Sequence, residues 1–318
     1  MSAAEAIGID LGGTKMLLGV LDGDSKTVWE SRERSAGEGE DELVELLVRE
    51  VEEARAEHGG VEAIGMGIPA TIVHEKGIAV AAVNLPIENL PIRDLVAERT
   101  GLPVFVDNDA NVAALAEHLY GAARGADNAV MLTIGTGIGG GLILGGEIYR
   151  GATGAGAELG HVVIAMDGLP CQGNCPGRGC VETYASGTAL AREGRAVAER
   201  EPDSALGRAL GEGPIAGKTV TELAIKGDKL AREVVAEAGR HLGVALASLA
   251  NIFDPDVIVI GGGVSVVGDL LLEPAREELR SRALDPMNKT LVKLAELGAD
   301  AGMIGAAAMA LIELDKES

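Results

Sequence analysis

The polar stretch at residues 107–111 (DNDAN) concentrates side chains that can do acid–base chemistry. An apolar run at 102–106 precedes it, and an alanine-rich helical pattern at 112–120 follows. In open α/β sheets, ligands bind at such strand-to-helix turns. One Asp or Asn is enough to serve as a helix N-cap, and this stretch contains four such residues. Asp109 is therefore either the helix cap or a catalytic base.

A second group of reactive side chains lies at residues 10–15 (DLGGTK), between apolar runs at 6–9 and 16–21. The pattern predicts two strands joined by a glycine turn. The turn carries backbone N–H groups, the Thr14 hydroxyl, the Lys15 ammonium and the Asp10 carboxylate, which suit a nucleotide phosphate and its magnesium ion. The spacing is not that of a Walker loop. A simple tight hairpin is the alternative.

Residues 135–141 (GTGIGGG) repeat this layout between apolar runs at 128–134 and 142–144. Two similar hairpins indicate an internal duplication, and two glycine turns that each hold a Thr favour a nucleotide held between two domains. A third glycine turn, at 261–263, follows an apolar strand at 257–260. It lets a helix or a flat ligand approach the backbone, or it is an ordinary strand-to-helix turn.

The chain has three cysteines, all within ten residues, and His161 shortly before them. The cysteines are Cys171, Cys175 and Cys180. One histidine and three cysteines form a complete tetrahedral zinc set, which is structural because no position stays open for water. The alternative is three free thiols in a glycine loop. Glu158 and Glu182 flank this segment, so a zinc ion would also fix their positions.

Hydrophobic periodicity predicts the elements that position these groups. We expect residues 71–83 to be irregular or edge structure and 202–214 to be a polar connection. Helices are expected at 41–57, 93–99, 184–201, 220–225, 228–252, 269–282 and 301–314, and further strands at 63–68 and 291–295. Strands that alternate with helices predict an α/β fold.

Composition limits the class of protein. With 318 residues and 47% hydrophobic content, the chain is long enough for two domains. A net charge of −22 argues against a nucleic-acid-binding surface. The N-terminus has no signal-peptide pattern, and the uncharged run 129–146 is too rich in glycine for a membrane helix. We expect a cytoplasmic protein without membrane contact.

In their order along the chain, these motifs resemble the ROK family of sugar kinases, open-reading-frame proteins and repressors. The resemblance covers about residues 7–311 and is greatest to the family's bacterial glucokinases. It implies a two-domain, actin-like ATPase fold (ribonuclease H-like) with the active-site cleft between the domains. We expect a smaller N-terminal α/β domain of residues 1–118 plus 302–318, and a larger C-terminal α/β domain of residues 119–301 that carries the zinc loop.

The resemblance also implies roles for single residues. Asp109 matches the catalytic base, and the sugar-contacting residues match Asn108, Asp109, Glu158, His161 and Glu182. The nucleotide-binding residues match Asp10, which helps to place Mg²⁺, and Gly12, Gly13, Thr14, Lys15, Gly135, Thr136, Gly137, Gly139, Gly261 and Gly262. His161 and the three cysteines match the zinc ligands. The cysteine spacing, Cys171-x3-Cys175-x4-Cys180, departs from the family's usual Cys-x-Cys-Gly-x-x-Gly-Cys.

The implied activity is ATP-dependent phosphorylation of the 6-hydroxyl of a hexose, and the resemblance favours glucose as the substrate. Asp109 would take the hydroxyl proton, and its place at a helix start should favour its ionised form. Open alternatives are a kinase for N-acetylmannosamine, N-acetylglucosamine, fructose or allose, and a polyphosphate-using glucokinase. A sugar-sensing repressor is disfavoured, because the first phosphate motif at Asp10 leaves no room for a helix-turn-helix arm. Family members imply a homodimer or homotetramer.

Overall fold

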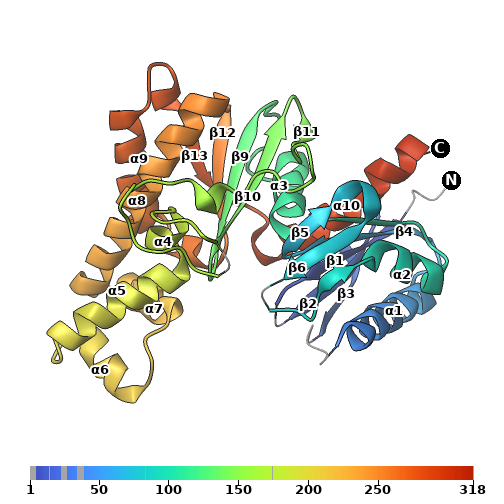
Figure 1. The fold of residues 1–318 in the computed structure, drawn as a ribbon, viewed down its shortest axis with the longest axis horizontal. Coiled ribbons are helices and arrows are strands. Elements are labelled where there is room, and N and C mark those ends of the chain that lie inside the picture. The colour runs from blue at the N-terminus through green and yellow to red at the C-terminus, as the bar shows by residue number, and fades with distance from the viewer. Residues whose placement is uncertain are drawn as a thin grey trace.

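The computed structural model describes residues 5–13, 15–22, 27–33, 39–82, 84–173 and 175–317. The chain forms two lobes, each built around a five-stranded sheet, and both termini lie on the same lobe (Figure 1). The α/β fold class is confirmed.

The two large sheets have the same topology. The first contains β1 (Glu5–Leu11), β2 (Met16–Leu21), β3 (Thr27–Glu33), β4 (Val61–Ile68) and β8 (Val104–Asn108), in the order β3-β2-β1-β4-β8. The second contains β9 (Ala129–Ile134), β10 (Ile138–Leu144), β11 (Glu147–Ile148), β12 (Val257–Gly261) and β13 (Leu291–Leu294), in the order β11-β10-β9-β12-β13. In both, the first three strands are antiparallel and the last two run parallel to the first. The predicted duplication is therefore visible in the topology.

A third, small sheet lies beside the first. It contains β5 (Ala70–Val73), β6 (Ile78–Ala82) and β7 (Glu88–Leu90), with a single 3-10 turn, η1 (His74–Lys76), between β5 and β6. The stretch 71–83, which we expected to be irregular or edge structure, supplies two of these strands over its described residues.

Helices cover both faces of the first sheet. In β1, Ile7, Ile9 and Leu11 pack with α1 (Glu40–Glu57) and α2 (Ile92–Thr100), whereas Ala6 packs with α10 (Ala301–Glu317) on the other face. Successive strand residues point to opposite faces. Asp10 therefore shares the α10 face, at the end of β1 where the glycine turn begins.

The second sheet is covered in the same manner. One face packs with α3 (Asp109–Tyr120) through small residues such as Ala113 and Ala114. The other face packs with α5 (Gly187–Arg200), α7 (Gly217–Ile225), α8 (Lys229–Phe253) and α9 (Asp269–Arg282). Shorter elements are α4 (Glu182–Ala185), α6 (Ala205–Glu212), and the 3-10 turns η2 (Leu159–His161), η3 (Gly263–Val267), η4 (Met287–Lys289) and η5 (Gly298–Asp300).

Three expectations about local structure are wrong. Residues 139–141 belong to strand β10, not to a loop, because close packing on both faces of this strand requires glycine there. The connection 202–214 contains helix α6, which Ser204 caps by accepting from the Gly207 N–H and which buries Leu206. The predicted helix 184–201 is divided into α4 and α5, since Ser186 begins a new helix with its own cap.

Helices α3 and α10 pack against each other, and Gly305 of α10 lies directly against the Val112 carbonyl oxygen of α3. At the far end of α3, the Glu117 carboxylate is fully buried. It accepts from the backbone N–H groups of Ala122, Glu296 and Leu297, at 2.8, 3.1 and 2.8 Å. Glu117 therefore ties the segment after α3 to the segment before α10.

Within the described ranges, the helices are all too short or too polar to cross a lipid bilayer.

Candidate active site

The turn between β8 and α3 is held by a buried ion pair. The Asp107 carboxylate is 1% exposed, and its Oδ2 lies 2.6 Å from Nε of Arg150, just after β11. Its Oδ1 accepts from the Asn108 backbone N–H at 2.7 Å and from the Asn111 amide at 2.8 Å. Asp107 is therefore fully engaged in holding the turn, and it connects the first sheet with the second.

Asn108 is the N-cap of α3. Its Oδ1 accepts from the backbone N–H groups of Ala110 and Asn111, at 2.9 and 3.4 Å. Its Nδ2 donates to the Ala70 carbonyl oxygen at 3.3 Å. This answers the question raised by the polar stretch, since the cap is Asn108 and the Asp109 carboxyl is not needed for capping.

Burial raises the pKa of the Asp109 carboxyl above its usual value of 3.8, and the nearby Glu158 charge raises it further. Backbone N–H groups at the start of α3 and the Asn108 side chain act in the opposite direction. We expected the helix start to keep Asp109 ionised, but loss of hydration outweighs that contribution. A carboxylate with a raised pKa is a better proton acceptor than one at its ordinary value.

The carboxyl of Asp10 is close enough to that of Asp109 for the two charges to interact. Burial, and secondly the Asp109 charge, raises the pKa of Asp10 from 3.8 to about 7. A Cβ placed on Gly302 would lie 2.5 Å from the Asp10 carboxyl carbon, so this carboxyl packs on the first turn of α10. Two partly buried carboxyls at one point are typical of a site for a divalent cation.

Strand β10 brings two parts of the site together through its glycines. A Cβ on Gly139 would lie 3.0 Å from the Ala110 Cβ, and one on Gly141 would lie 2.5 Å from the Ala114 Cβ. On the opposite face, a Cβ on Gly140 would collide with the carbonyl oxygen of Ala157. Alternate glycines thus admit helix α3 to one face and the segment before Glu158 to the other.

A small pocket lies where these segments meet. It is lined by Ala70, Thr71, Ile72, Asn108, Gly139, Gly140 and residues 154–158. The lining therefore comes from β5, β8, β10 and the loop that ends at Glu158, and so from both large sheets. Asn108 and Glu158, two of the predicted sugar-contacting residues, are part of it.

The other three predicted sugar contacts, Asp109, His161 and Glu182, do not line this pocket. Oε2 of Glu182 accepts from the Ile138 backbone N–H at 2.7 Å and lies against Gly137. His161 faces Glu158, with Nε2 and Oε2 3.9 Å apart. These two residues thus join the Glu158 segment and the second glycine turn to the cysteine loop.

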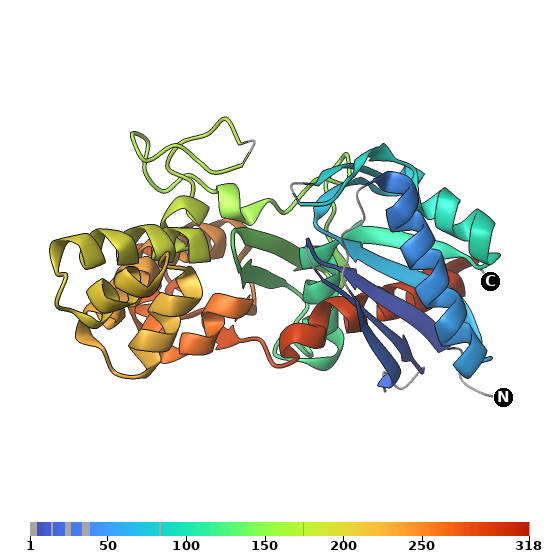
Figure 2. The ribbon, with the colours of Figure 1, turned by 90° about the horizontal axis from the view of Figure 1, so that it is seen from below.

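His161, Cys171, Cys175 and Cys180 form one cluster, with their ligand atoms all within 4.8 Å of one another. The Cys171 Sγ lies 3.5 Å from the His161 Nδ1 and 3.9 Å from Glu182 Oε1. Burial raises the pKa of Cys171, and it raises that of Cys180 to about 12. A bound cation would reverse this effect, because coordination stabilises the thiolate. The cysteine loop projects from its lobe in Figure 2.

The predicted nucleotide-binding residues fall into two groups. Gly12, Gly13 and Lys15 lie at the tip of the β1–β2 hairpin, where Lys15 is exposed and a Cβ on Gly13 would lie 2.7 Å from the Asn84 Cβ. Thr14 lies outside the described residues.

The second group surrounds the start of α5. The Gly187 N–H donates to the Gly135 carbonyl oxygen at 2.8 Å, and the Thr188 hydroxyl donates to the Thr136 carbonyl oxygen at 2.8 Å. Gly262 has φ +83°, and a Cβ there would lie 2.5 Å from the Ile134 backbone. Only glycine fits at position 262, which places the 261–263 turn beside the end of β9.

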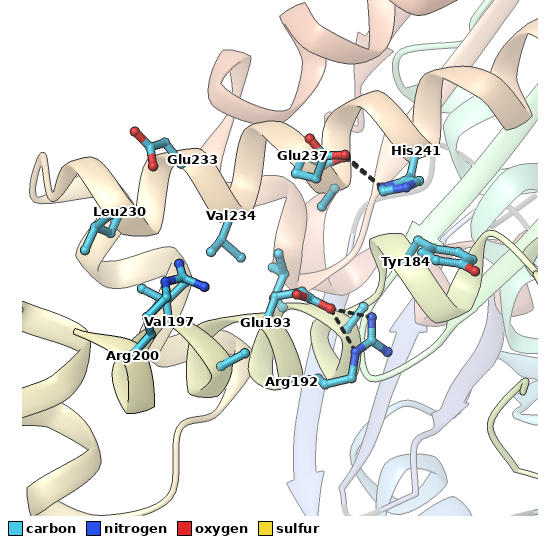
Figure 3. A pocket seen from close by; sticks show the side chains of 14 residues that line it. Tyr184, Arg192, Glu193, Val197, Arg200, Leu230, Glu233, Val234, Glu237 and His241 are labelled. Carbon is cyan, nitrogen blue, oxygen red and sulfur yellow. Dashed lines mark hydrogen bonds and ion pairs between the residues drawn. The ribbon is translucent and has the colours of Figure 1, made fainter. Parts of the chain in front are cut away.

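A separate, larger pocket between α5 and α8 contains none of the predicted site residues (Figure 3). Tyr184 and His241 stack there, with ring centroids 4.7 Å apart, and the Tyr184 hydroxyl accepts from the Leu169 N–H at 2.9 Å. Its charged groups pair locally, such as Arg192 with Glu193. Tyr184 thus connects this pocket to the segment before the cysteines, and the two pockets share no lining residue.

Sequence reasoning missed Arg150. The residue follows a two-residue strand in a glycine-rich region, and nothing in its spacing marks it. Its role depends on Asp107, 43 positions earlier in the chain.

The chain is similar to known proteins over nearly its whole length. A family profile described as the ROK family matches residues 6–313. The chain is 36% identical to a glucokinase of Streptomyces coelicolor, over 96% of each chain. It is also 36% identical to a glucokinase of Thermotoga maritima, over 97% of this chain and 98% of the relative. A crystal structure of a ROK family glucokinase from Streptomyces griseus, in complex with glucose and AMPPNP, superposes with a TM-score of 0.85 at 37% identity, over 96% of this chain and 99% of that one.

Proposed function

Because this chain belongs to the ROK family, we propose that it is an ATP-dependent kinase that phosphorylates the 6-hydroxyl of glucose. The observation that carries the proposal is that the carboxyls of Asp10 and Glu158 both lie near that of Asp109. Glu158 also lines a pocket whose other residues come from strands of both large sheets. The solved relative with glucose and an ATP analogue supports glucose and ATP as the substrates.

In the proposed reaction, the sugar binds in the pocket lined by Asn108 and Glu158. Asp109 accepts the proton of the 6-hydroxyl as its oxygen attacks the terminal phosphorus of ATP. The new bond joins the sugar oxygen to phosphorus, the bond from phosphorus to the ADP oxygen breaks, and ADP leaves. The raised pKa of Asp109 suits this role, because it lets the carboxylate hold the proton once transferred.

Asp10 is the residue that would hold Mg²⁺, which neutralises charge on the phosphates when bound. The carboxyl fits a cation, since burial and the Asp109 charge leave it poorly stabilised as an anion. The glycine turns at 12–13, 135–137 and 261–262 would bind the nucleotide with Thr14, Lys15, Thr136 and Gly139.

We also propose that His161, Cys171, Cys175 and Cys180 hold a structural Zn²⁺. The donor set fits, because one imidazole and three sulfur atoms complete tetrahedral coordination without leaving a position for water. Such an ion would hold Glu182 against β10 and His161 beside Glu158, and thereby keep the sugar-binding side of the site in place.

The proposed domain division is residues 1–118 plus 302–318 and residues 119–301. The two sheets of equal topology support a division into two units, and Glu117 joins the segment after α3 to the segment before α10. Helix α3, which this division assigns to the first unit, packs on a face of the second sheet. The homo-oligomeric state and the cytoplasmic location stay predictions.

A coupled assay of ADP release over a panel of sugars tests the function. We expect glucose to give the highest kcat/KM among glucose, N-acetylglucosamine, N-acetylmannosamine, fructose and allose. A parallel series with polyphosphate in place of ATP tests the donor. The proposal is wrong if purified protein turns over none of the hexoses with ATP and Mg²⁺.

A further inference from the structure

The loop between β11 and Glu158 is held in an unusual conformation. Gly151 and Gly154 have φ +72° and +87°, and Ala157 has φ +65°, which is rare for a residue with a side chain. A strained residue persists only where its surroundings impose the conformation.

Three contacts hold the loop. The Gly156 N–H donates to the Arg150 carbonyl oxygen at 2.9 Å, which closes the loop on itself. Gly154 packs on the small sheet, where its Cβ would lie 2.6 Å from the Ile72 carbonyl oxygen. The Ala157 carbonyl oxygen lies against Gly140 of β10. All three fix the loop to itself or to a neighbouring backbone.

A fourth contact, at the base of the loop, is ionic. The Arg150 side chain is 21% exposed and the Asp107 side chain 1%, and their atoms Nε and Oδ2 lie 2.6 Å apart. Such a charge-assisted bond is about twice as strong as a neutral one. Because Asp107 directly precedes the cap Asn108, the pair connects the base of the loop to the turn that presents Asp109.

We propose that Arg150 is a positioning residue for sugar binding. Its ion pair with Asp107 fixes the base of the 151–157 loop to the β8–α3 turn. The loop in turn positions Glu158 relative to Asn108 and Asp109. This inference rests on the proposed function. Arg150 does not line the pocket, so its effect is transmitted through the loop that does. Over the part of the chain that the structure describes, the Arg150 side chain pairs with Asp107 and not with a residue of the nucleotide turns. We therefore expect ATP binding to be nearly independent of Arg150.

The experiment compares Arg150→Gln and Arg150→Lys with the unmodified chain. Arg150→Gln removes the charge, and Arg150→Lys keeps the charge but lacks the Nε donor at this position. We expect Arg150→Gln to raise the KM for glucose by about tenfold or more, with the KM for ATP changed by less than about twofold. Arg150→Lys should give an intermediate value. Arg240→Gln, which removes an exposed ion pair on α8, is the matched control and should leave both constants unchanged.

Hydrogen exchange in the ligand-free proteins provides a second readout that does not need turnover. Arg150→Gln should exchange faster at residues 151–158, with unchanged exchange in α5 and β12. A glucose KM within about twofold of the unmodified chain, or unchanged exchange in the loop, overturns the inference. If the unmodified chain fails to phosphorylate glucose, the proposed function is wrong instead, and the exchange measurement still decides whether Arg150 holds the loop. If Arg150→Gln does not fold, Arg150→Lys is read by the same two criteria.

Discussion

Asp109 lies close enough to Asp10 for its charge to raise the pKa of Asp10, in addition to the larger effect of burial, to about 7. Asp10 is the last but one residue of the first sheet's central strand, and Asp109 begins the helix after the last strand of the same sheet. Ionising both carboxyls without a counter-ion is costly. The arrangement is therefore stable with Asp10 protonated, or with a cation beside it.

This relationship predicts how the stability of the ligand-free protein varies with pH. Folded Asp10 has a pKa of about 7, above the unfolded value of 3.8, so the folded chain binds more protons between these values. The stabilising contribution of Asp10 is complete below about pH 4 and is lost as the pH rises through about 7. Asp10→Asn removes this dependence, so its melting temperature relative to the unmodified chain should rise from about pH 5 to about pH 8.

Thermal unfolding without Mg²⁺ or nucleotide measures this difference. Asp203→Asn, at an exposed position, is the control and should follow the unmodified chain at each pH. Parallel curves for the Asp10 variant and the unmodified chain would contradict the assigned pKa.

Replacement of the base should separate catalysis from binding. Asp109→Asn keeps the size of the side chain but cannot accept the hydroxyl proton. We expect kcat to fall by about 10²–10⁴-fold while the dissociation constant for glucose, measured by calorimetry, changes by only a few fold. A fall in kcat of less than about tenfold would remove Asp109 from the role of base.

The close contact between β10 and α3 makes Gly141 sensitive to any side chain. A Cβ there would lie 2.5 Å from the Ala114 Cβ and 2.8 Å from the Ala110 carbonyl oxygen. Gly141→Ala should lower the free energy of unfolding by about 1–3 kcal/mol, because the sheet and the helix must separate. Gly211→Ala is the matched control: its Cβ meets nothing within 4 Å, and alanine should stabilise helix α6 by up to about 1 kcal/mol. Denaturant titration of both variants distinguishes packing from a general effect of the substitution.

The cysteine cluster predicts a stoichiometric metal. Elemental analysis should find about one zinc per chain, and Cys175→Ser should reduce it. A strong chelator should lower the melting temperature of the unmodified protein more than that of Cys175→Ser. His58→Gln, which changes a histidine outside the cluster, should keep its zinc. Metal-free protein with an unchanged melting temperature would exclude a structural zinc ion.

Much of the fold could be predicted from local patterns. Apolar runs beside glycine turns indicated β1, β2, β9 and β12, and helical periodicity indicated α1, α8 and α9 to within a few residues. The repeated hairpin layout anticipated two sheets of one topology. These elements can be predicted because the hydrophobic periodicities of strands and helices differ, and because glycine is common in turns.

The glycines of β10 show the limit of this reasoning. A run of Gly-Gly-Gly has low intrinsic preference for a strand, and we assigned it to a loop. In the structure these residues form a strand, with α3 packed on one face and the segment at Ala157 on the other. These contacts join residues that are far apart in the chain, such as Gly141 and Ala110, which are 31 positions apart.

Residue types and spacing alone were enough to identify the groups that can do chemistry: the carboxylates at 10 and 109, the glycine turns and the histidine–cysteine set. The separate roles of neighbouring residues depend on the tertiary structure. It made Asn108 the cap, Asp107 the partner of Arg150, and Asp109 a carboxyl whose pKa is raised by burial. Capping, pairing and burial depend on distances between side chains and on the water they exclude, and neither residue type nor spacing along the chain specifies those.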